Sequence, residues 1–450
     1  MYYPMNPTDK ENWQENPTAR NAHDTLVPLS ASSPWSQALG PTHLAWMWSN
    51  ESPENWNKVS KPDLWFVYRT NPAISFWDTK SVTERISEFP FVVSFAYIRD
   101  ETNHMADVLL PECTDFESTQ LIRVGGTKFS ESYWDHEGVA LRQPAIKPLG
   151  ETRDFTDIAT EIAKRAGVLE NYNNAINRGA GGIPLRGGNY DFSLDVEQVH
   201  ESEDIWEAMC KAASAELTDG AETDGLAWYK EHGMRTRPIS RLIWYLFPEL
   251  KKQGLRFEMP YQEQLLRVGK QLGNRLHEKG IEWWNEQLKE YEALPPWKDF
   301  PGIWEQATVN SGGKLEDYPF WLLTSRSMQL AWGSNSSNQM IDEVSKNMHG
   351  HRAMIMNTSR AKEMGIEEGD LVEIKSTLRS TKGRVALKQG IRPDTILIQG
   401  QFDHWVTPYS KDNPAPSMNT VVPMSLALTD ATGSSADIVR VGVHKLEGAA

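Results

Sequence analysis

The chain has 450 residues, and its 46 Lys and Arg residues against 61 Asp and Glu residues give a formal net charge of −15 at pH 7. Hydrophobic residues make up 39% and charged residues 24%, which is typical of a folded globular protein and excludes a disordered chain. The acidic balance excludes a general nucleic-acid binder, because such proteins need a basic face, so we expect no nucleic-acid partner. No apolar run reaches the roughly 18 residues of a membrane span.

The sequence contains only two cysteines, Cys113 and Cys210. Two thiols exclude a disulfide framework, and they exclude a four-cysteine zinc or iron–sulfur site within these residues. We expect both to be buried free thiols, since free cysteine behaves as a small hydrophobic residue. The N-terminus has no basic segment followed by an apolar one, so it does not resemble a secretory signal.

Residues 1–60 are rich in Pro, Asn, Ser and Trp and show no sustained period, which predicts irregular structure. A folded domain rarely starts with so long a structureless stretch. We therefore expect either that this segment wraps over a partner surface or that the chain begins inside a larger domain, as a truncated domain would.

An α/β pattern follows in residues 60–150. The apolar run 64–68 predicts a buried strand, the spacing of apolar residues in 78–89 predicts a helix, and runs 91–96 and 106–111 predict two more strands. This order is typical of parallel βαβ units, whose ligands bind in the loops at the carboxyl ends of the strands. Those loops are residues 69–73 and 98–105.

The middle of the chain, residues 151–299, is predicted to be mainly helical. Residues 112–150 before it are mixed and contain several glycines. Apolar spacing predicts a helix over 152–166 that ends at Gly167, whereas 168–200 is predicted to be loop. Residues 202–293 are helical in pattern and end in a long amphipathic run, 261–294. Residues 293–298, which include two prolines, are predicted to be a linker.

Residues 300–450 are predicted to form a β-rich domain. Short apolar runs separated by turn residues predict strands at 320–324, 353–357, 371–374, 384–387 and 395–398. Strands at such near-regular spacing are typical of a barrel or a sandwich. A short helix is predicted over 358–364, with Thr358 as N-cap and Gly365 after its end.

The motifs of common enzyme classes are mostly absent. Gly125-Gly126-Thr127-Lys128 lacks the upstream glycine of a phosphate-binding loop, so we interpret it as a plain turn. No Gly-x-Ser-x-Gly elbow occurs. His349 and His351 have the residue type of metal ligands, but they lie in a polar loop without an obvious third ligand, which favours a solvated loop.

Polar clusters at strand ends are the best candidates for a site. Residues 324–327 and 333–338 follow a predicted strand and precede a helix, where backbone N–H groups and Arg326 suit an anion such as a phosphate. The same pattern also fits a polar connection that caps the helix, and the residues alone leave both alternatives open. A second cluster is 403–405, and a third contains Asn413 and Asn419; together they could bond to the edge of a purine or pterin.

Five segments, taken in chain order, resemble the catalytic subunit of molybdopterin oxidoreductases of the dimethyl sulfoxide reductase family. They are Asn71-Pro72 after a strand, Glu101-Thr102 after the next strand, Ala106–Pro111, Gln143–Pro148 and the stretch from Leu323–Arg326 to Ala361–Val372. The resemblance covers residues 60–445. Within the family, His136–Pro144 and Ala175–Gly179 are most similar to the branch of phenylacetyl-coenzyme A oxidoreductase, acetylene hydratase and thiosulfate reductase-like enzymes.

The resemblance implies a fold and a cofactor. Residues 60–150 would be the last part of a dinucleotide-binding-like α/β domain, and residues 300–450 a C-terminal double-psi β-barrel that closes over the cofactor. The cofactor would be a pair of molybdopterin guanine dinucleotides around one Mo or W. The residues expected to line it are Asn71, Pro72, Glu101 and Thr102 at one dinucleotide, Thr324, Ser325, Arg326, Asn335 and Asn338 at pterin and pyrophosphate, and His404, Trp405 and Asn419 at the pterin end.

The chain also departs from the family pattern. The family's N-terminal part carries a cysteine cluster for [4Fe–4S] and a Cys, Ser or Asp that ligates the metal, and neither is found here. We therefore expect the chain to be the C-terminal part of the enzyme, as a truncated gene product or one piece of a split subunit.

The departure also defines the expected partners. The first is the N-terminal part of the catalytic subunit, which would hold the cluster. The second is an iron–sulfur electron-transfer subunit, and an optional third is a membrane anchor subunit. An export signal would lie on the N-terminal part, so the sequence leaves the location unknown, with the cytoplasm and the periplasm as the alternatives. The expected activity is oxygen-atom or hydroxyl transfer coupled to electron transfer. The alternative is a non-catalytic module that binds pterin or nucleotide, or assists assembly.

Overall fold

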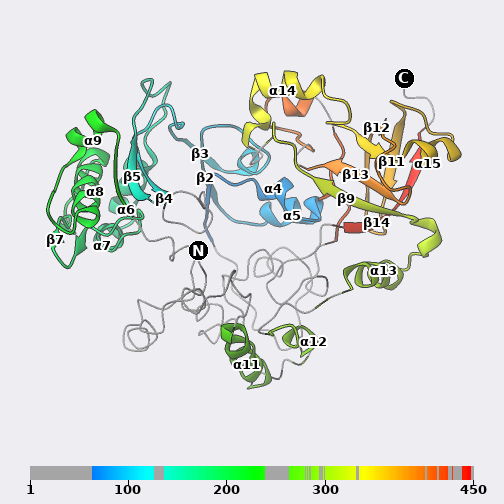
Figure 1. The fold of residues 1–450 in the computed structure, drawn as a ribbon, viewed down its shortest axis with the longest axis horizontal. Helices are drawn as coiled ribbons and strands as arrows, with labels where there is room; N and C mark the ends of the chain where they lie inside the picture. The colour runs from blue at the N-terminus through cyan, green and yellow to red at the C-terminus, as the bar shows by residue number, and fades with distance from the viewer. Residues whose placement is uncertain are drawn as a thin grey trace. The chain divides into compact units, whose positions relative to one another are not determined.

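The structure is a computed structural model that describes residues 63–125, 136–238, 263–278, 280, 282, 285–292, 297, 299–330, 334–400, 403–412, 415–423, 428 and 438–446 (Figure 1). Predictions for residues 1–60, 126–128, 295–296 and 413 lie outside these ranges. The chain divides into two compact units: the first contains the described residues up to 94, 98–109 and those after 260, and the second contains 95–97 and those of 110–259. In the described ranges, no helix has the length and apolar character needed to cross a membrane.

The α/β segment contains a three-stranded sheet in the order β1-β2-β3, formed by Trp65–Tyr68, Val92–Ala96 and Val108–Pro111. β2 and β3 run parallel, because Asp107 N–H bonds to Val92 O at their start and Glu112 N–H bonds to Ala96 O at their end. All side chains of β2 are buried. β1 was predicted to be buried, but only one face of it is covered: Val67 is 1% exposed, whereas Phe66 and Tyr68, on the opposite face, are 47% and 43% exposed.

Short helices fill the loops of this segment. The predicted helix at 78–89 is confirmed as α5 (Thr79–Ile86). The loop after β1 contains α4 (Pro72–Ser75), whose first residue is a proline, and the loop after β2 contains the 3-10 turn η2 (Asn103–Met105). Proline suits the first position of a helix, since its missing N–H would have no partner there. Both loops thus present defined backbone at the carboxyl ends of β1 and β2.

The second unit combines an antiparallel sheet with helices. Its sheet has the order β4-β5-β8, formed by Gln120–Gly125, His136–Arg142 and Met234–Pro238. Its other elements are α6 (Phe155–Arg165), α7 (Leu169–Asn177), the hairpin of β6 (Arg186–Gly187) and β7 (Tyr190–Asp191), α8 (Ser202–Leu217) and α9 (Leu226–His232). α6 ends as predicted, with Gly167 at a φ of 73°.

Residues 112–150, for which the sequence predicted no particular element, contain β4 and β5. Two predictions for this unit are wrong. Part of the helical stretch 202–293 is strand β8, whose side chains alternate between exposed and half-buried positions. Residues 168–200 contain helix α7. Asn lowers helix propensity, but Asn173 and Asn177 are buried on α7 and bond to the backbone of residues 194–198, which stabilises the helix through tertiary contacts.

The predicted amphipathic run 261–294 is divided into separate helices. α11 (Glu263–Glu278) ends before Gly280, whose φ of 67° is a left-handed conformation that favours glycine. α12 (Asn285–Leu288) follows, and then α13 (Phe300–Asn310) precedes the barrel. The buried Trp304 of α13 belongs to the barrel's apolar core.

Six strands close a barrel within the described residues, in the order β10-β12-β11-β14-β9-β13 (Figure 1). This outcome confirms a barrel over a sandwich. The strands are β9 (Phe320–Ser325), β10 (Met354–Met356), β11 (Leu371–Lys375), β12 (Ser380–Leu387), β13 (Thr395–Gln399) and β14 (Ile438–Lys445). Two neighbouring pairs, β10–β12 and β9–β13, are parallel, and the other four are antiparallel.

The barrel's helices and turns are α14 (Gln339–Lys346), α15 (Thr358–Glu363), η4 (Leu315–Asp317), η5 (Ser334–Ser337) and η6 (Ser410–Asp412). The helix predicted at 358–364 is confirmed, but its N-cap is Asn357 instead of Thr358. Asn357 Oδ1 accepts from Arg360 N–H at 3.0 Å, while its Nδ2 donates to Ile391 O at 2.7 Å. Gly365 follows the helix with a φ of 67°, as predicted.

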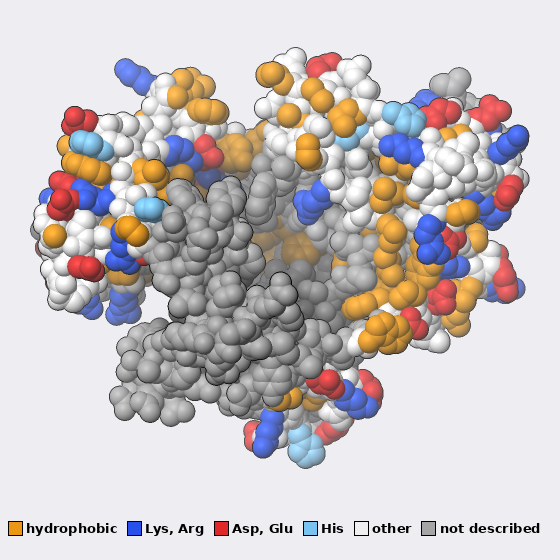
Figure 2. Space-filling model, in the orientation of Figure 1, with side chains coloured by type: hydrophobic (Ala, Val, Ile, Leu, Met, Phe, Trp, Pro, Cys, Tyr) orange, Lys and Arg blue, Asp and Glu red, His pale blue; other side chains and the backbone are white. Residues whose placement is uncertain are grey.

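Charged side chains of both signs are mixed on the described surface. On the face shown in Figure 2, Lys and Arg side chains lie among Asp and Glu side chains and do not gather into a basic stripe. This distribution agrees with the acidic net charge of −15.

Candidate functional site

The carboxyl ends of β9 and β13 meet at one edge of the barrel. The two strands are parallel neighbours in register, so that Thr324 lies opposite Ile398 and Ser325 opposite Gln399. Gly400 N–H then bonds to Ser325 O at 2.9 Å. The loops that follow, 326–338 and 400–412, therefore start side by side, as expected for a ligand site at parallel strand ends.

The first of these loops, 326–338, contains hydrogen-bond donors and acceptors that form no bond with the described residues. Arg326 is exposed and forms no hydrogen bond or ion pair with any described residue. Asn335 Nδ2 donates to Gln329 O at 2.6 Å, whereas its Oδ1 is buried without a partner in the described structure. Asn338 is the N-cap of α14, with Oδ1 accepting from Met340 N–H at 2.9 Å. The helix-capping interpretation thus holds for Asn338, and the anion interpretation stays open for Arg326.

The loops after β1 and β2 are joined by Asn71. Its Nδ2 donates to Glu101 Oε2 at 2.7 Å, and its Oδ1 accepts from the N–H and the hydroxyl of Thr102 at 3.1 and 2.8 Å. Thr102 Oγ1 in turn accepts from Ala73 N–H at 3.0 Å, in the first turn of α4. Pro72 is the buried first residue of that helix. Three of the predicted residues, Asn71, Glu101 and Thr102, therefore form one hydrogen-bonded cluster, and Pro72 follows Asn71 in the chain.

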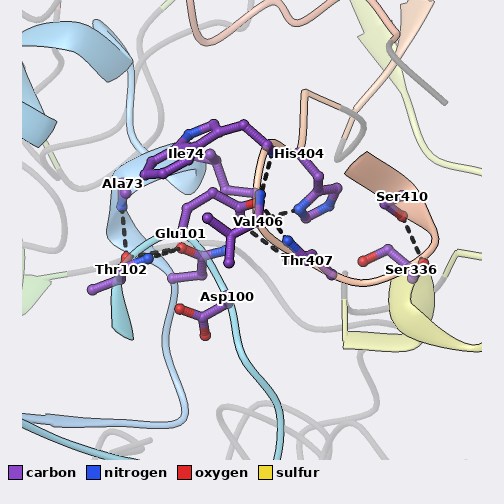
Figure 3. A network of polar contacts seen from close by, with 12 residues as sticks. Ala73, Ile74, Asp100, Glu101, Thr102, Ser336, His404, Val406, Thr407 and Ser410 are labelled. Carbon is purple, nitrogen blue, oxygen red and sulfur yellow. Dashed lines mark hydrogen bonds and ion pairs between the residues drawn. The ribbon is translucent and has the colours of Figure 1, made fainter. Parts of the chain in front are cut away.

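Glu101 is fully buried and receives hydrogen bonds from six donors (Figure 3). Oε1 accepts from the successive backbone N–H groups of Trp405, Val406 and Thr407 at 2.8, 2.8 and 3.0 Å. Oε2 accepts from Asn71, from the Thr407 hydroxyl at 2.9 Å and from His404 Nδ1 at 3.2 Å. The predicted dinucleotide contact of Glu101 stays a prediction, but its carboxylate is engaged by the protein.

The pKa of Glu101 reflects this environment. Burial by itself raises the pKa, but the hydrogen bond from His404, together with the N–H groups of Thr407 and Val406, holds the pKa well below its usual range. Glu101 is therefore ionised. Two neighbouring acids shift in the other direction: burial raises the pKa of Asp100 to about 6, and burial also raises the pKa of Asp403.

The three residues predicted at the pterin end occupy different positions. His404 is buried, and its Nε2 has no hydrogen-bond partner among the described residues. Trp405 uses its backbone N–H for Glu101 and is 48% exposed as a residue, and its indole packs edge-to-face on His104 with ring centroids 5.6 Å apart. Asn419 Nδ2 donates to Ile74 O at 2.7 Å, which ties the barrel to the end of α4.

Sequence reasoning missed two residues of this site. Thr407 completes the cluster around Glu101 with its N–H and its hydroxyl. Gln399 ends β13 opposite Ser325, and its Oε1 is buried without a partner in the described part of the chain. Its place directly after a predicted strand was a usable signal, because Thr324 and Ser325 were chosen as candidates by the same criterion, a polar residue at the end of a predicted strand. No sequence signal marked Thr407.

The two histidines considered as metal ligands have other surroundings. His349 Nε2 lies 3.0 Å from Glu368 Oε1 on the surface, and His351 Nδ1 lies 2.5 Å from Ser345 Oγ in a buried position. Across the described ranges, no group of three or more His, Cys, Asp or Glu side chains is arranged to hold a metal ion. Cys113 and Cys210 are both buried, and they do not form a disulfide with each other, as expected.

Comparisons with known proteins agree with this geometry. The molybdopterin oxidoreductase family matches residues 38–165, and the molybdopterin dinucleotide-binding domain matches residues 320–435. The respiratory nitrate reductase subunit alpha of Haloferax mediterranei is 22% identical over 85% of this chain and 37% of its own length. The molybdopterin-containing thiosulfate reductase subunit of Salmonella typhimurium is 22% identical over 75% of this chain and 38% of its own length.

A solved structure shows the same fold. Acetylene hydratase from Pelobacter acetylenicus superposes on 92% of this chain and 47% of its own, with a TM-score of 0.58 and 12% sequence identity. The barrel, its strand-end loops and the two family matches define a protein with a molybdopterin dinucleotide-binding domain. The chain belongs to the molybdopterin oxidoreductases of the dimethyl sulfoxide reductase family. It spans about two fifths of the length of the curated relatives it matches, 37% and 38% for the two above.

Proposed function

We propose that this chain is the part of a Mo or W oxidoreductase that binds molybdopterin guanine dinucleotide, and that the whole enzyme transfers an oxygen atom or a hydroxyl group. The observation that carries the proposal is the edge of the barrel, where an exposed guanidinium and buried amide and imidazole atoms without partners gather in the strand-end loops. Buried polar atoms are normally paired, so unpaired ones at a strand edge fit a polar ligand. The proposed barrel type is double-psi.

Each residue has a role in this proposal. Arg326, with Thr324 and Ser325, holds a pyrophosphate, because a guanidinium makes two parallel charge-assisted bonds to phosphate. The amides of Asn335 and Gln399 and the imidazole of His404 bond to the edges of the pterin and guanine rings. When bound, the metal centre supplies the two-electron chemistry of the reaction.

The remaining parts of the enzyme lie outside the residues that carry this site. We propose that the metal ligand and any [4Fe–4S] cluster come from polypeptide other than these residues, since the sequence contains two cysteines and a cluster needs four ligands. Three relatives are named as subunits of nitrate reductase, thiosulfate reductase and sulfite dehydrogenase. An electron-transfer subunit is accordingly a proposed partner here.

The test compares Arg326→Lys and Arg326→Ala in the natively expressed protein by metal and pterin content after purification. Each charge-assisted bond is worth about 1.5–3 kcal/mol, so Arg326→Ala should lose most of the cofactor. Lys keeps the charge but not the two-pronged geometry, so Arg326→Lys should lose an intermediate amount. Circular dichroism should stay unchanged in both.

Arg392→Ala is the matched control for this series. Arg392 is exposed on the same barrel, and its guanidinium forms its hydrogen bonds and ion pair with Asp394 among the described residues, so its removal should leave the cofactor content at the wild-type level. Full cofactor retention in Arg326→Ala, or unfolding of the barrel by that change, would contradict the assignment. The loop would then have only its helix-capping role.

A further inference from the structure

The contacts of Glu101 fix the position of a proton on His404. Glu101 is ionised and accepts from five donors besides the imidazole. A carboxylate only accepts hydrogen bonds, so the ring nitrogen that faces it, His404 Nδ1 at 3.2 Å, must carry a proton. In the neutral ring the other nitrogen, Nε2, then has a lone pair and acts as an acceptor.

We propose that Glu101 is a positioning residue that keeps His404 in the Nδ1–H tautomer, so that Nε2 accepts a hydrogen bond from a ring or exocyclic N–H of the bound ligand. The inference rests on the proposed function for the identity of that ligand. An aminopyrimidinone edge, which pterin and guanine share, supplies such N–H donors. Glu101 thereby acts on the ligand through His404 and does not contact it.

Two further observations support this proposal. His404 is only 8% exposed, and its Nε2 is a buried polar atom without a partner among the described residues. A buried acceptor left unpaired is costly, which indicates that something other than the described protein satisfies it. The loop itself is held on both sides, because Glu101 bonds to residues 404–407 and Ser410 Oγ donates to Ser336 O at 2.6 Å (Figure 3). The imidazole is therefore presented on a fixed backbone.

The test uses the double variant Glu101→Gln with Asn71→Asp. The glutamine introduced in place of Glu101 should keep its oxygen toward the three backbone N–H groups, which places its NH₂ group against His404 Nδ1 and the side chain that replaces Asn71. The amide then donates to Nδ1, and the imidazole proton moves to Nε2. The carboxylate introduced in place of Asn71 accepts from the second amide hydrogen, so the net charge is preserved. Of the six hydrogen bonds to Glu101, only the one from the Thr407 hydroxyl loses its acceptor. The structural role of Glu101 is thus kept in all but this one bond, while the tautomer is reversed.

The readout is the tautomer of His404 in the cofactor-free full chain, measured at pH 8.5 by ¹⁵N NMR with labelled histidine. His404→Gln identifies the signal. We expect Nδ1–H in the wild type and Nε2–H in the double variant, with unchanged circular dichroism. An Nε2–H or doubly protonated ring in the wild type, or the same tautomer in both proteins, would overturn the inference.

The ligand is probed with 6-hydroxymethylpterin and with guanosine diphosphate in separate titrations. We expect one of them to shift the Nε2 signal of the wild type and to bind at least tenfold more weakly to the double variant; the probe that does so identifies the ring. A missing shift with both probes also contradicts the inference. Failure of the proposed function shows separately, as natively purified protein without metal and pterin, and it leaves the tautomer result intact.

Discussion

At the scale of single residues, the cluster around Glu101 joins segments that lie 303 to 306 residues apart in the sequence. Its six donors satisfy a carboxylate that burial alone would make costly. Asn71 adds a second connection by bonding to both Glu101 and Thr102. Since Glu101 has a lowered pKa, its contribution to stability is present above the unfolded-state pKa of about 4.3 and is lost as the pH falls.

Asp100, next to Glu101, should have the opposite effect on stability. Burial, and after it the charge of Glu101, raises the pKa of Asp100 to about 6 from 3.8. A raised acid pKa in the folded state means that ionisation disfavours folding, so the penalty grows between pH 3.8 and 6 and is complete above that range. Asp100→Asn should therefore stabilise the protein at pH 8, on the order of 2 kcal/mol, and have little effect at pH 4.

Urea unfolding at several pH values measures this difference. Asn retains the acceptor that Asn103 N–H uses at 2.8 Å, so the local turn is kept. The exposed Glu84→Gln on α5 is the control and should show no comparable pH dependence. A constant difference between Asp100→Asn and the wild type from pH 4 to pH 8 would show that the Asp100 carboxyl is not perturbed.

Only part of this residue-scale arrangement is readable from the sequence. Motif order selected Asn71, Glu101, Thr102 and His404, and the structure brings all four together. The sequence did not indicate that the carboxylate of Glu101 bonds to backbone N–H groups of residues 405–407, because those contacts depend on how two distant loops pack. Thr407 was missed for the same reason.

At the scale of elements, the barrel was easier to predict than the second unit. Strands with strong apolar runs, such as β9 and β13, were found at nearly their full length. The first half of β12, Ser380–Gly383, is polar and was missed, and so was β14. Their position is set by pairing with neighbouring strands rather than by their own composition.

Helix α7 gives an element-scale prediction. Asn173 Nδ2 lies within hydrogen-bond distance of three backbone carbonyls, those of Asp195, Val196 and Gln198, at 3.3, 3.0 and 2.8 Å. Asn173→Ala would remove the fully buried amide to which these carbonyls bond, at a cost on the order of 1–3 kcal/mol. Thermal and urea unfolding of the full chain should show the loss.

The control for this prediction is Asn171→Ala on the exposed face of the same helix. Alanine has the higher helix propensity, so this variant should be neutral or stabilised by about 0.5 kcal/mol. If both variants unfolded at the same denaturant concentration, the buried amide would have no part in holding residues 194–198 on α7.

At the scale of the whole molecule, iron content gives a direct prediction. Cys113 and Cys210 are the chain's two cysteines, and both are buried. The 450-residue chain should therefore bind no [4Fe–4S] cluster after anaerobic reconstitution with iron and sulfide. Iron analysis and visible absorbance measure this; stoichiometric iron with the absorbance of a cluster would contradict it.

The central claim concerns the cofactor, and it is tested most directly by analysing the natively purified protein with any chains that co-purify. Mo and W are measured by mass spectrometry, the pterin by its fluorescence after oxidation, and guanosine monophosphate after its release by acid. The account predicts one Mo or W atom, with pterin and guanosine monophosphate each in about twofold excess over the metal, because the proposed cofactor contains two dinucleotides. Purified protein that contains no Mo or W, no pterin and no guanosine monophosphate would contradict this account.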